Sequence, residues 1–248
     1  IQAYWKTAPA SFALTKTAAS VKPLNIVGVA GGAAQPDAEM WWMIKLSLEG
    51  STQSYGKDYA KWADFTDTMT LPAGVAWSET AKTAIQNSTA RWSGADLYAG
   101  DVLIAQVKMG SSASLSLVDR SVAWDETADT AVFKWRVRNT SDKAELGAVT
   151  VNFYVYPAAL SVDMEKFSQE TDGIIQNQAS AEVSYHYCAP KTVESNIAEK
   201  HIQGGTGSIQ VEKTATGVKY FGEDVTYTLG VYNKGALPWT GEASGSYT

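Results

Sequence analysis

The side chains that most often do chemistry are scarce in this chain. Cys188 is the single cysteine among 248 residues, so no internal disulfide, zinc–thiolate cluster or paired redox motif can form. His186 and His201 are the only two histidines, which leaves little for a metal site or a nucleophile–histidine pair. We therefore expect neither a metal nor a cofactor.

Carboxylates offer the next possibility. Asp64 and Asp67 lie close in sequence, but glycoside hydrolysis needs two carboxyl groups opposed across a cleft. The acidic run at 125–129 lacks the spacing of a calcium-binding loop, which favours a solvated turn. Because a nucleophile elbow and a glycine-rich phosphate loop are also missing, we expect that the chain is not an enzyme. A glycosidase on a sandwich scaffold stays as a third alternative.

Tryptophans offer a binding surface. Trp41, Trp42, Trp77, Trp92 and Trp124 could stack on the apolar faces of sugars if they gather on one exposed face. In a large sandwich most tryptophans belong to the core. The sequence does not choose between these readings, so a carbohydrate-binding module remains the alternative function.

The elements that must position these residues are mainly strands. Residues 133–138 alternate apolar and cationic side chains, which is the pattern of a strand with one buried and one solvated face. The same alternation runs through 42–48, 149–155, 181–187 and 225–231, and more weakly through 12–17, 102–109 and 114–118. So many one-sided strands predict an all-β, two-layer antiparallel sandwich.

Three segments depart from the alternation. Residues 78–85 and 161–167 each begin with a serine that could cap a helix, so we expect two short helical insertions between strands. The glycine-rich residues 204–208 are typical of a flexible connection between domains.

Charge and composition limit the classes of partner that this chain is expected to bind. The net charge of −6, from 20 basic and 26 acidic residues without a basic block, argues against nucleic acid and anionic lipid surfaces. No apolar run approaches the roughly 20 residues that a bilayer-spanning helix needs, so we expect no membrane insertion. The chain opens at Ile1 without a signal-peptide pattern, which we interpret as a processed or excised segment.

A short internal repeat is the most specific feature of the sequence. The pattern L-T-K-T-A at 14–18 is echoed by V-E-K-T-A at 211–215, and each copy precedes an alternating strand. The second copy continues with G-E-D-V-T-Y-T at 222–228 and N-K-G at 233–235. It resembles a repeat of Gram-positive cell-surface proteins that reads K-T-A, G-D-x-V-T-Y-T, N-x-G.

The first copy is similar to a complete, enlarged member of the same group. Residues 67–74 resemble its D-x-L-P-x-G turn with two extra residues, and 177–179 resemble its closing N-x-A strand. The resemblance leaves 27–37 and 79–121 unmatched. It implies an immunoglobulin-like sandwich of the pilin and collagen-adhesin type.

Relatives of this type often carry a spontaneous Lys–Asn isopeptide bond assisted by an acid, and the resemblance places Lys16, Asn177 and Asp67 in these roles. Burial lowers the pKa of a lysine and raises that of a carboxyl, giving a neutral amine and an acid that can protonate the attacked amide. Trp62 or Trp135 would supply dry walls. The plainer alternative has Lys16 reaching water, Asp67 capping a turn and Asn177 bonding the backbone, and the sequence leaves both open.

Two neighbouring candidates compete with these residues. Asp64 could replace Asp67 as the acid, but a three-residue spacing puts the two on opposite faces of a strand, and Asp67 heads the turn pattern. Lys213 is the matching lysine of the second copy. Because no acid or asparagine strand follows it, we expect Lys213 to be unpaired.

Two further motifs are weaker. The first resembles a sortase-type cell-wall sorting signal and consists of Leu237, Pro238, Trp239, Thr240 and Gly241. No apolar segment or basic tail follows it in 243–248. A proline-interrupted segment before another strand is therefore the favoured interpretation. Cys188 and Gln53 resemble a thioester pair in reversed order, so a lone cysteine on a strand is favoured instead.

The sequence thus predicts an enlarged immunoglobulin-like sandwich at 9–190, a linker at 191–207, and the first strands of a second, incomplete repeat at 208–248. The expected function is that of a structural or adhesive module of a bacterial cell-surface protein, a pilin or an adhesin stalk. It would be extracellular, attached to the cell wall or a pilus. Its partners would be neighbouring modules of the same protein and a host or matrix protein or glycan that the sequence does not identify.

Overall fold

The computed structural model describes residues 8–18, 24–27, 35–36, 40–49, 57–112, 114–140, 146–163, 173–203, 209–216 and 226–233. The strands are β1 (Ala8–Pro9), β2 (Phe12–Ala18), β3 (Leu24–Val27), β4 (Gln35–Pro36), β5 (Met40–Leu48), β6 (Lys57–Asp58), β7 (Ala60–Thr70), β8 (Val75–Trp77), β9 (Arg91–Ser93), β10 (Asp96–Ala99), β11 (Val102–Met109), β12 (Leu115–Asp125), β13 (Thr130–Asn139), β14 (Val149–Val155), β15 (Leu160–Val162), β16 (Gly173–Tyr185), β17 (Lys191–Glu194), β18 (Ala198–Gln203), β19 (Ile209–Thr216) and β20 (Thr226–Asn233). The helices are α1 (Glu79–Gln86) and the 3-10 turn η1 (Pro157–Ala159).

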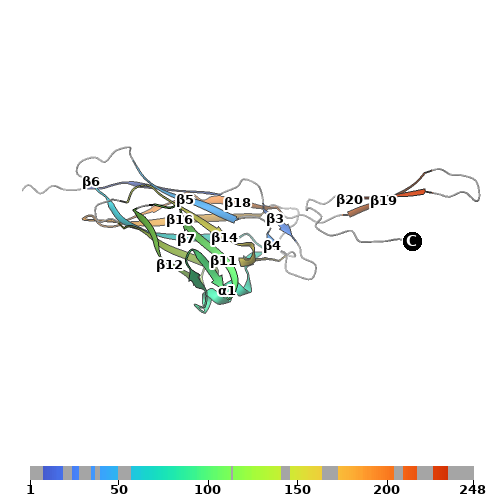
Figure 1. Ribbon diagram of the computed structural model, residues 1–248, viewed down its shortest axis with the longest axis horizontal. Coiled ribbons are helices and arrows are strands. Elements are labelled where there is room, and N and C mark those ends of the chain that lie inside the picture. Colours follow the sequence, from blue (N-terminus) through green and yellow to red (C-terminus); the bar gives the residue numbers. More distant parts are fainter. Residues whose placement is uncertain are drawn as a thin grey trace, which may run out of the picture.

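Two large sheets form the body of the molecule (Figure 1). The first sheet has the order β2-β5-β14-β11-β10-β9, and its pairs are antiparallel. The second has the order β12-β13-β7-β16-β18-β3-β4, with β17 also paired to β16. The prediction of an all-β sandwich of mainly antiparallel strands with short helical insertions is confirmed, and β3 pairs with β18 in parallel.

The alternation of side chains decides which face of each strand is buried. On β13, Phe133, Trp135 and Val137 are at most 1% exposed, whereas Lys134 and Arg138 face solvent. One inward face per sheet therefore lines a common core.

An aromatic cluster joins the two sheets at the centre of this core. The ring centroid of Phe153, on β14, lies 4.8 Å from that of Phe133 and 6.0 Å from that of Trp135, and both of these residues belong to the opposite sheet. Trp42, from the neighbouring strand β5, lies 6.1 Å from Phe153. Contacts between large buried rings make this layer the dry interior against which other side chains pack.

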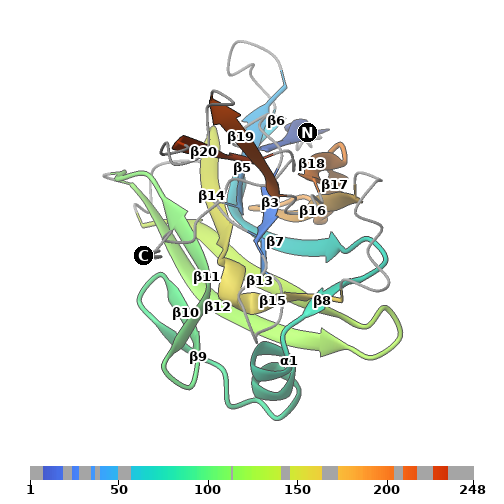
Figure 2. The ribbon, with the colours of Figure 1, turned by 90° about the vertical axis from the view of Figure 1, so that its right-hand side faces the viewer.

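The predicted helix at 78–85 is confirmed, whereas the one predicted at 161–167 is wrong in its described part, residues 161–163. Ser78 caps α1, its side chain accepting a hydrogen bond from the Ala81 N–H. Ser161 instead lies in β15, paired with Ala76 of β8, because the preceding 3-10 turn leads into an extended segment; residues 164–167 are outside the described residues. Figure 2 shows α1 beside β8 and β9. Among the described residues, no helix has the length and apolar character needed to cross a bilayer.

The start of the predicted linker, 191–203, is instead built into the second sheet. Thr192 of β17 pairs with Glu182, and Lys200 of β18 pairs with Ile175, so both strands lie along β16. The sequence missed them because each strand is too short to show a clear alternation. Residues 204–207 lie outside the described residues.

The second predicted unit is described as the hairpin β19–β20. Val211, Tyr227, Leu229 and Val231 of this hairpin are 54–63% exposed. A two-stranded hairpin buries little apolar surface by itself, as expected from the short segment. The division of the chain into two domains stays a prediction.

Candidate functional site

Lys16 and Asp67 meet inside the sandwich. Lys16 occupies an inward-facing position of β2 in the first sheet, and Asp67 an inward-facing position of β7 in the second. The Lys16 Nζ donates a hydrogen bond to Asp67 Oδ2, and both side chains are 0% exposed. A direct lysine–carboxyl contact therefore spans the two sheets without access to water.

Asn177 lies beside this pair on β16. It pairs with Met69, while Ala179, two residues further on, pairs with Asp67, so Asn177 and Asp67 are diagonal neighbours on the inward face. The Asn177 residue is 1% exposed, and neither Oδ1 nor Nδ2 has a hydrogen-bond partner within the described residues. The Oδ1 of Asp67 is likewise without one. A buried carboxamide without partners is costly, so this one is a candidate for chemistry.

The walls around the lysine are aromatic. The Nζ of Lys16 lies 5.9 Å from the ring centroids of both Trp42 and Phe153. Trp135, predicted as a wall, is buried and stacks on Phe153, but Trp62, the other predicted wall, faces outward. The actual nearest rings belong to predicted strands at positions of inward parity, a signal that could have identified them.

Burial perturbs both ionisable groups in the direction of neutrality. Desolvation lowers the pKa of Lys16, although the neighbouring Asp67 opposes the change. Desolvation raises the pKa of Asp67, opposed by Lys16 and by a weaker interaction with the Asn177 side chain. Both pKa shifts are toward the uncharged amine and the protonated carboxyl, which are the forms that nucleophilic attack on an amide requires.

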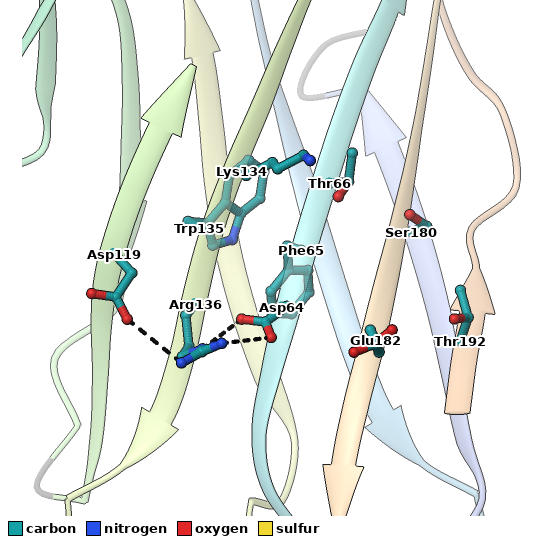
Figure 3. A pocket seen from close by; sticks show the side chains of 10 residues that line it. All are labelled: Asp64, Phe65, Thr66, Asp119, Lys134, Trp135, Arg136, Ser180, Glu182 and Thr192. Atoms are coloured by element: carbon teal, nitrogen blue, oxygen red, sulfur yellow. Dashed lines mark hydrogen bonds and ion pairs between the residues drawn. The ribbon is translucent and has the colours of Figure 1, made fainter. Parts of the chain in front are cut away.

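Asp64 takes the opposite face of β7, as alternation predicts. Its carboxylate accepts two hydrogen bonds from Arg136, at 2.6 Å from Nε and 2.9 Å from Nη2. This pair lines a groove of about 580 Å³ on the outer face of the second sheet. Figure 3 shows the Arg136 side chain reaching the Asp64 carboxylate on the neighbouring strand. The hollow of the groove follows from the short side chains of Thr66, Ser180 and Thr192 between longer charged ones.

The remaining candidates lie apart from the buried pair. Cys188 is a half-buried cysteine outside any disulfide, at a bend after β16 rather than on a strand, and its N–H donates to Asp58. Lys213 of β19 lies over the ring of Tyr227 at 4.0 Å from its centroid. The five residues of the sorting-like motif are outside the described residues.

The acidic run at 125–129 forms a local turn, as the sequence favours. Asp125 Oδ1 accepts hydrogen bonds from the N–H groups of Thr127 and Ala128, which closes a local turn. No group of three or more histidine, cysteine or carboxylate side chains suited to a metal is present among the described residues.

Two residues that sequence reasoning missed touch the site from outside. Asn196 forms hydrogen bonds with the main chain of Lys16, and Ser195 with the main chain of Ala179, two residues from Asn177. Both fall in the segment that the sequence assigns to a linker. No local pattern in 191–203 signals them, because their partners are distant in sequence.

The solved structures to which this chain is distantly similar include two proteins that bind or adhere to collagen. The collagen-binding subdomain of the Enterococcus faecalis surface protein ACE is 10% identical, covering 75% of this chain and 94% of that chain with a TM-score of 0.31. The collagen adhesin of S. aureus is 8% identical and covers 89% of this chain with a TM-score of 0.26; this chain spans 51% of its length. No protein family and no curated protein matches the chain. At these values neither likeness assigns a family or a function.

Proposed function

We propose that the chain is a structural or adhesive module of a bacterial cell-surface protein, a pilin or an adhesin stalk, stabilised by an autocatalytic isopeptide bond between Lys16 and Asn177. One observation carries the proposal. The Lys16 amine and the Asp67 carboxyl are in contact in a fully buried site, beside an Asn177 carboxamide that lacks hydrogen-bond partners among the described residues.

The proposed step balances without a cofactor. Asp67 takes a proton from the Lys16 ammonium, which leaves a neutral amine facing the Asn177 carboxamide. The Lys16 Nζ attacks Asn177 Cγ while Asp67 protonates the amide; the Cγ–Nδ2 bond then breaks, and one ammonia molecule leaves. A Cγ–Nζ amide bond has formed, the attacking Nζ gives its second proton to Asp67, and Asp67 ends as a neutral, protonated carboxyl.

The product removes a buried charge pair and adds a covalent tie. Replacing two desolvated charges by a neutral amide relieves the desolvation that such pairs suffer. By the loop-entropy relation for disulfides, a tie between β2 and β16 stabilises by roughly 5 kcal/mol. This suits a module that carries tension outside the cell, on a wall or pilus, between neighbouring modules and a matrix protein or glycan. Because the step consumes its own side chains, the module is not a turnover enzyme.

The alternative of a carbohydrate-binding module gains no support from the described tryptophans. Trp42, Trp77 and Trp135 are at most 3% exposed and belong to the core. Trp41 is half-buried and stacks on Tyr154 at 5.3 Å. The other three described tryptophans, Trp62, Trp92 and Trp124, are also half-buried. Arg136 lies over the ring of Trp62, and Lys82 over that of Trp124.

Intact mass spectrometry tests the proposal. The mass of the unsubstituted chain is expected to be lower than the mass calculated from its sequence by one ammonia molecule. The Lys16→Met and Asn177→Ala variants are each expected to have the full mass calculated from their own sequences. Proteolysis followed by fragment sequencing should recover a branched peptide that joins Lys16 to Asn177. A chain at its full sequence mass, with Lys16 and Asn177 in separate peptides, contradicts the cross-link.

A further inference from the structure

An irregularity in the second sheet faces the buried pair. β17 and β18 lie along the same side of β16, where Glu194 pairs with Ser180 and Ala198 pairs with Asn177 (Figure 2). Residues 195–197 on one side therefore oppose 178–179 on the other, three residues against two. This is a β-bulge, a feature that redirects a side chain out of the regular ladder.

The bulge directs Asn196 to the other sheet. Its Oδ1 accepts a hydrogen bond from the Lys16 N–H at 3.0 Å, and its Nδ2 donates to the Lys16 carbonyl at 2.8 Å. One side chain thus supplies both hydrogen bonds that a neighbouring strand would give at this residue. Since β2 is the end strand of its sheet, these bonds fix the main chain that carries the lysine.

The adjacent Ser195 makes the matching contacts on β16. Its N–H donates to the Ala179 carbonyl at 2.8 Å, and its Oγ accepts from the Ala179 N–H at 3.0 Å. Ala179 lies opposite Asp67 and two residues from Asn177. Two consecutive residues, which we call the Ser195–Asn196 clamp, therefore tie the backbone of the lysine strand to that of the asparagine strand.

The clamp lies next to an opening between the sheets. A hollow of about 410 Å³ is lined by Lys16, Thr17 and Ala18 of β2 and by residues 198–201 of β18. The Lys16 side chain nevertheless stays at 0% exposure. The Asn196 bonds hold β2 in place beside this hollow, at the residue whose amine must stay dry.

We propose that Ser195 and Asn196 are positioning residues of the cross-link, which align Lys16 with Asn177 and exclude water at the edge of β2. This inference rests on the proposed function, because it assigns a role in forming that bond. Neither residue takes part in the bond changes. Their effect is on the distance and angle between the reacting atoms, to which reaction rates are very sensitive.

The rate of ammonia loss in freshly folded protein tests the clamp. Asn196→Leu keeps the approximate shape but removes the donor and the acceptor, and it should slow the loss by about ten-fold or more in protein that is folded by circular dichroism. Asn196→Gln keeps the carboxamide and should recover part of the rate. Gln176→Ala is the matched control, because it removes a bond from β16 to Glu199 of β18 without touching β2 and should react at the unsubstituted rate.

A second measurement does not require the bond to form. In an Asn177→Ala background Lys16 is free, and an amine-acylating reagent should leave it unmodified while the clamp is intact. Adding Asn196→Leu should make Lys16 reactive. If the unsubstituted chain keeps its ammonia, the proposed function fails, and with it the role of the clamp in the cross-link; the acylation result then decides only whether the clamp shields Lys16. Unchanged protection of Lys16, or an Asn196→Leu protein that cross-links at the full rate, overturns the inference.

Discussion

The side chain of Lys16 donates a hydrogen bond across the two sheets to Asp67, which lies 51 residues further along the chain, and neither side chain is exposed to solvent. A buried ion pair seldom gains enough from mutual attraction to offset the loss of hydration of both charges. In this site, burial shifts both pKa values toward the neutral forms. The arrangement is therefore better suited to a reaction that removes the charges than to an ion pair that persists.

The two aspartates of β7 should respond differently to the same substitution. Asp67→Asn removes the carboxyl that carries the proton, so ammonia loss should slow by roughly 10²–10⁴-fold. Asp64→Asn alters only the half-exposed pair with Arg136 and should leave the cross-link intact, with a stability change within about 1 kcal/mol. Intact mass followed over time, with urea unfolding for stability, measures both. Equal rates in the two variants would remove Asp67 from the mechanism.

Removing the lysine should make stability depend on pH. In Lys16→Met, Asp67 loses its cation, and burial alone holds the pKa of its carboxyl above the usual value of 3.8. The folded state then binds more protons than the unfolded state above that value, so the free energy of unfolding should fall as the pH rises from about 4 to about 7. Urea titrations across this range measure the slope.

The matched control is the double variant Lys16→Met/Asp67→Asn, in which no carboxyl is buried at this site. Its stability should be nearly flat over the same pH range. A single variant without the slope would indicate that Asp67 is hydrated once the lysine is absent.

The extent to which sequence predicts this molecule differs between fold and site. Alternation identifies long strands such as β13 and places Asp67 inward and Asp64 outward, because both follow from the two-residue period. Assigning Lys16 and Asn177 needed the resemblance to surface repeats, since nothing local distinguishes them. Asn196 was missed because its role depends on a bulge and on a strand 180 residues away.

Asp58 should give the fold an acid-sensitive anchor. Burial pushes the pKa of its carboxyl upward, but hydrogen bonds from the N–H groups of Tyr187, Cys188 and His186 outweigh it, so the net pKa is lowered. Its stabilising effect is present above the unfolded pKa of about 3.8 and is lost as the pH falls through the folded value. Asp58→Asn should cost about 1–3 kcal/mol near neutral pH, and less in acid.

Asp129→Asn is the comparison for Asp58. Its carboxylate is 72% exposed and pairs with Lys82, so the loss should be at most about 1 kcal/mol. Chemical unfolding of both variants near pH 7 and near pH 3 separates them. A difference between Asp58→Asn and the unsubstituted chain that does not shrink in acid would argue against a depressed pKa.

Thr130 should stabilise the end of β7 that pairs with Asn177 without affecting the cross-link. Its Oγ1 donates to the Met69 carbonyl at 2.9 Å and accepts from Trp77 Nε1 at 3.0 Å, and the residue is 6% exposed. Thr130→Val preserves shape and leaves both partners unsatisfied, so it should cost about 1–3 kcal/mol. Thr130→Ser keeps the hydroxyl and should recover most of that loss. Because neither variant alters Lys16, Asp67 or Asn177, both should lose ammonia completely. A folded Thr130→Val protein without the cross-link would contradict this expectation and would show that the reaction also needs the Thr130 hydrogen bonds.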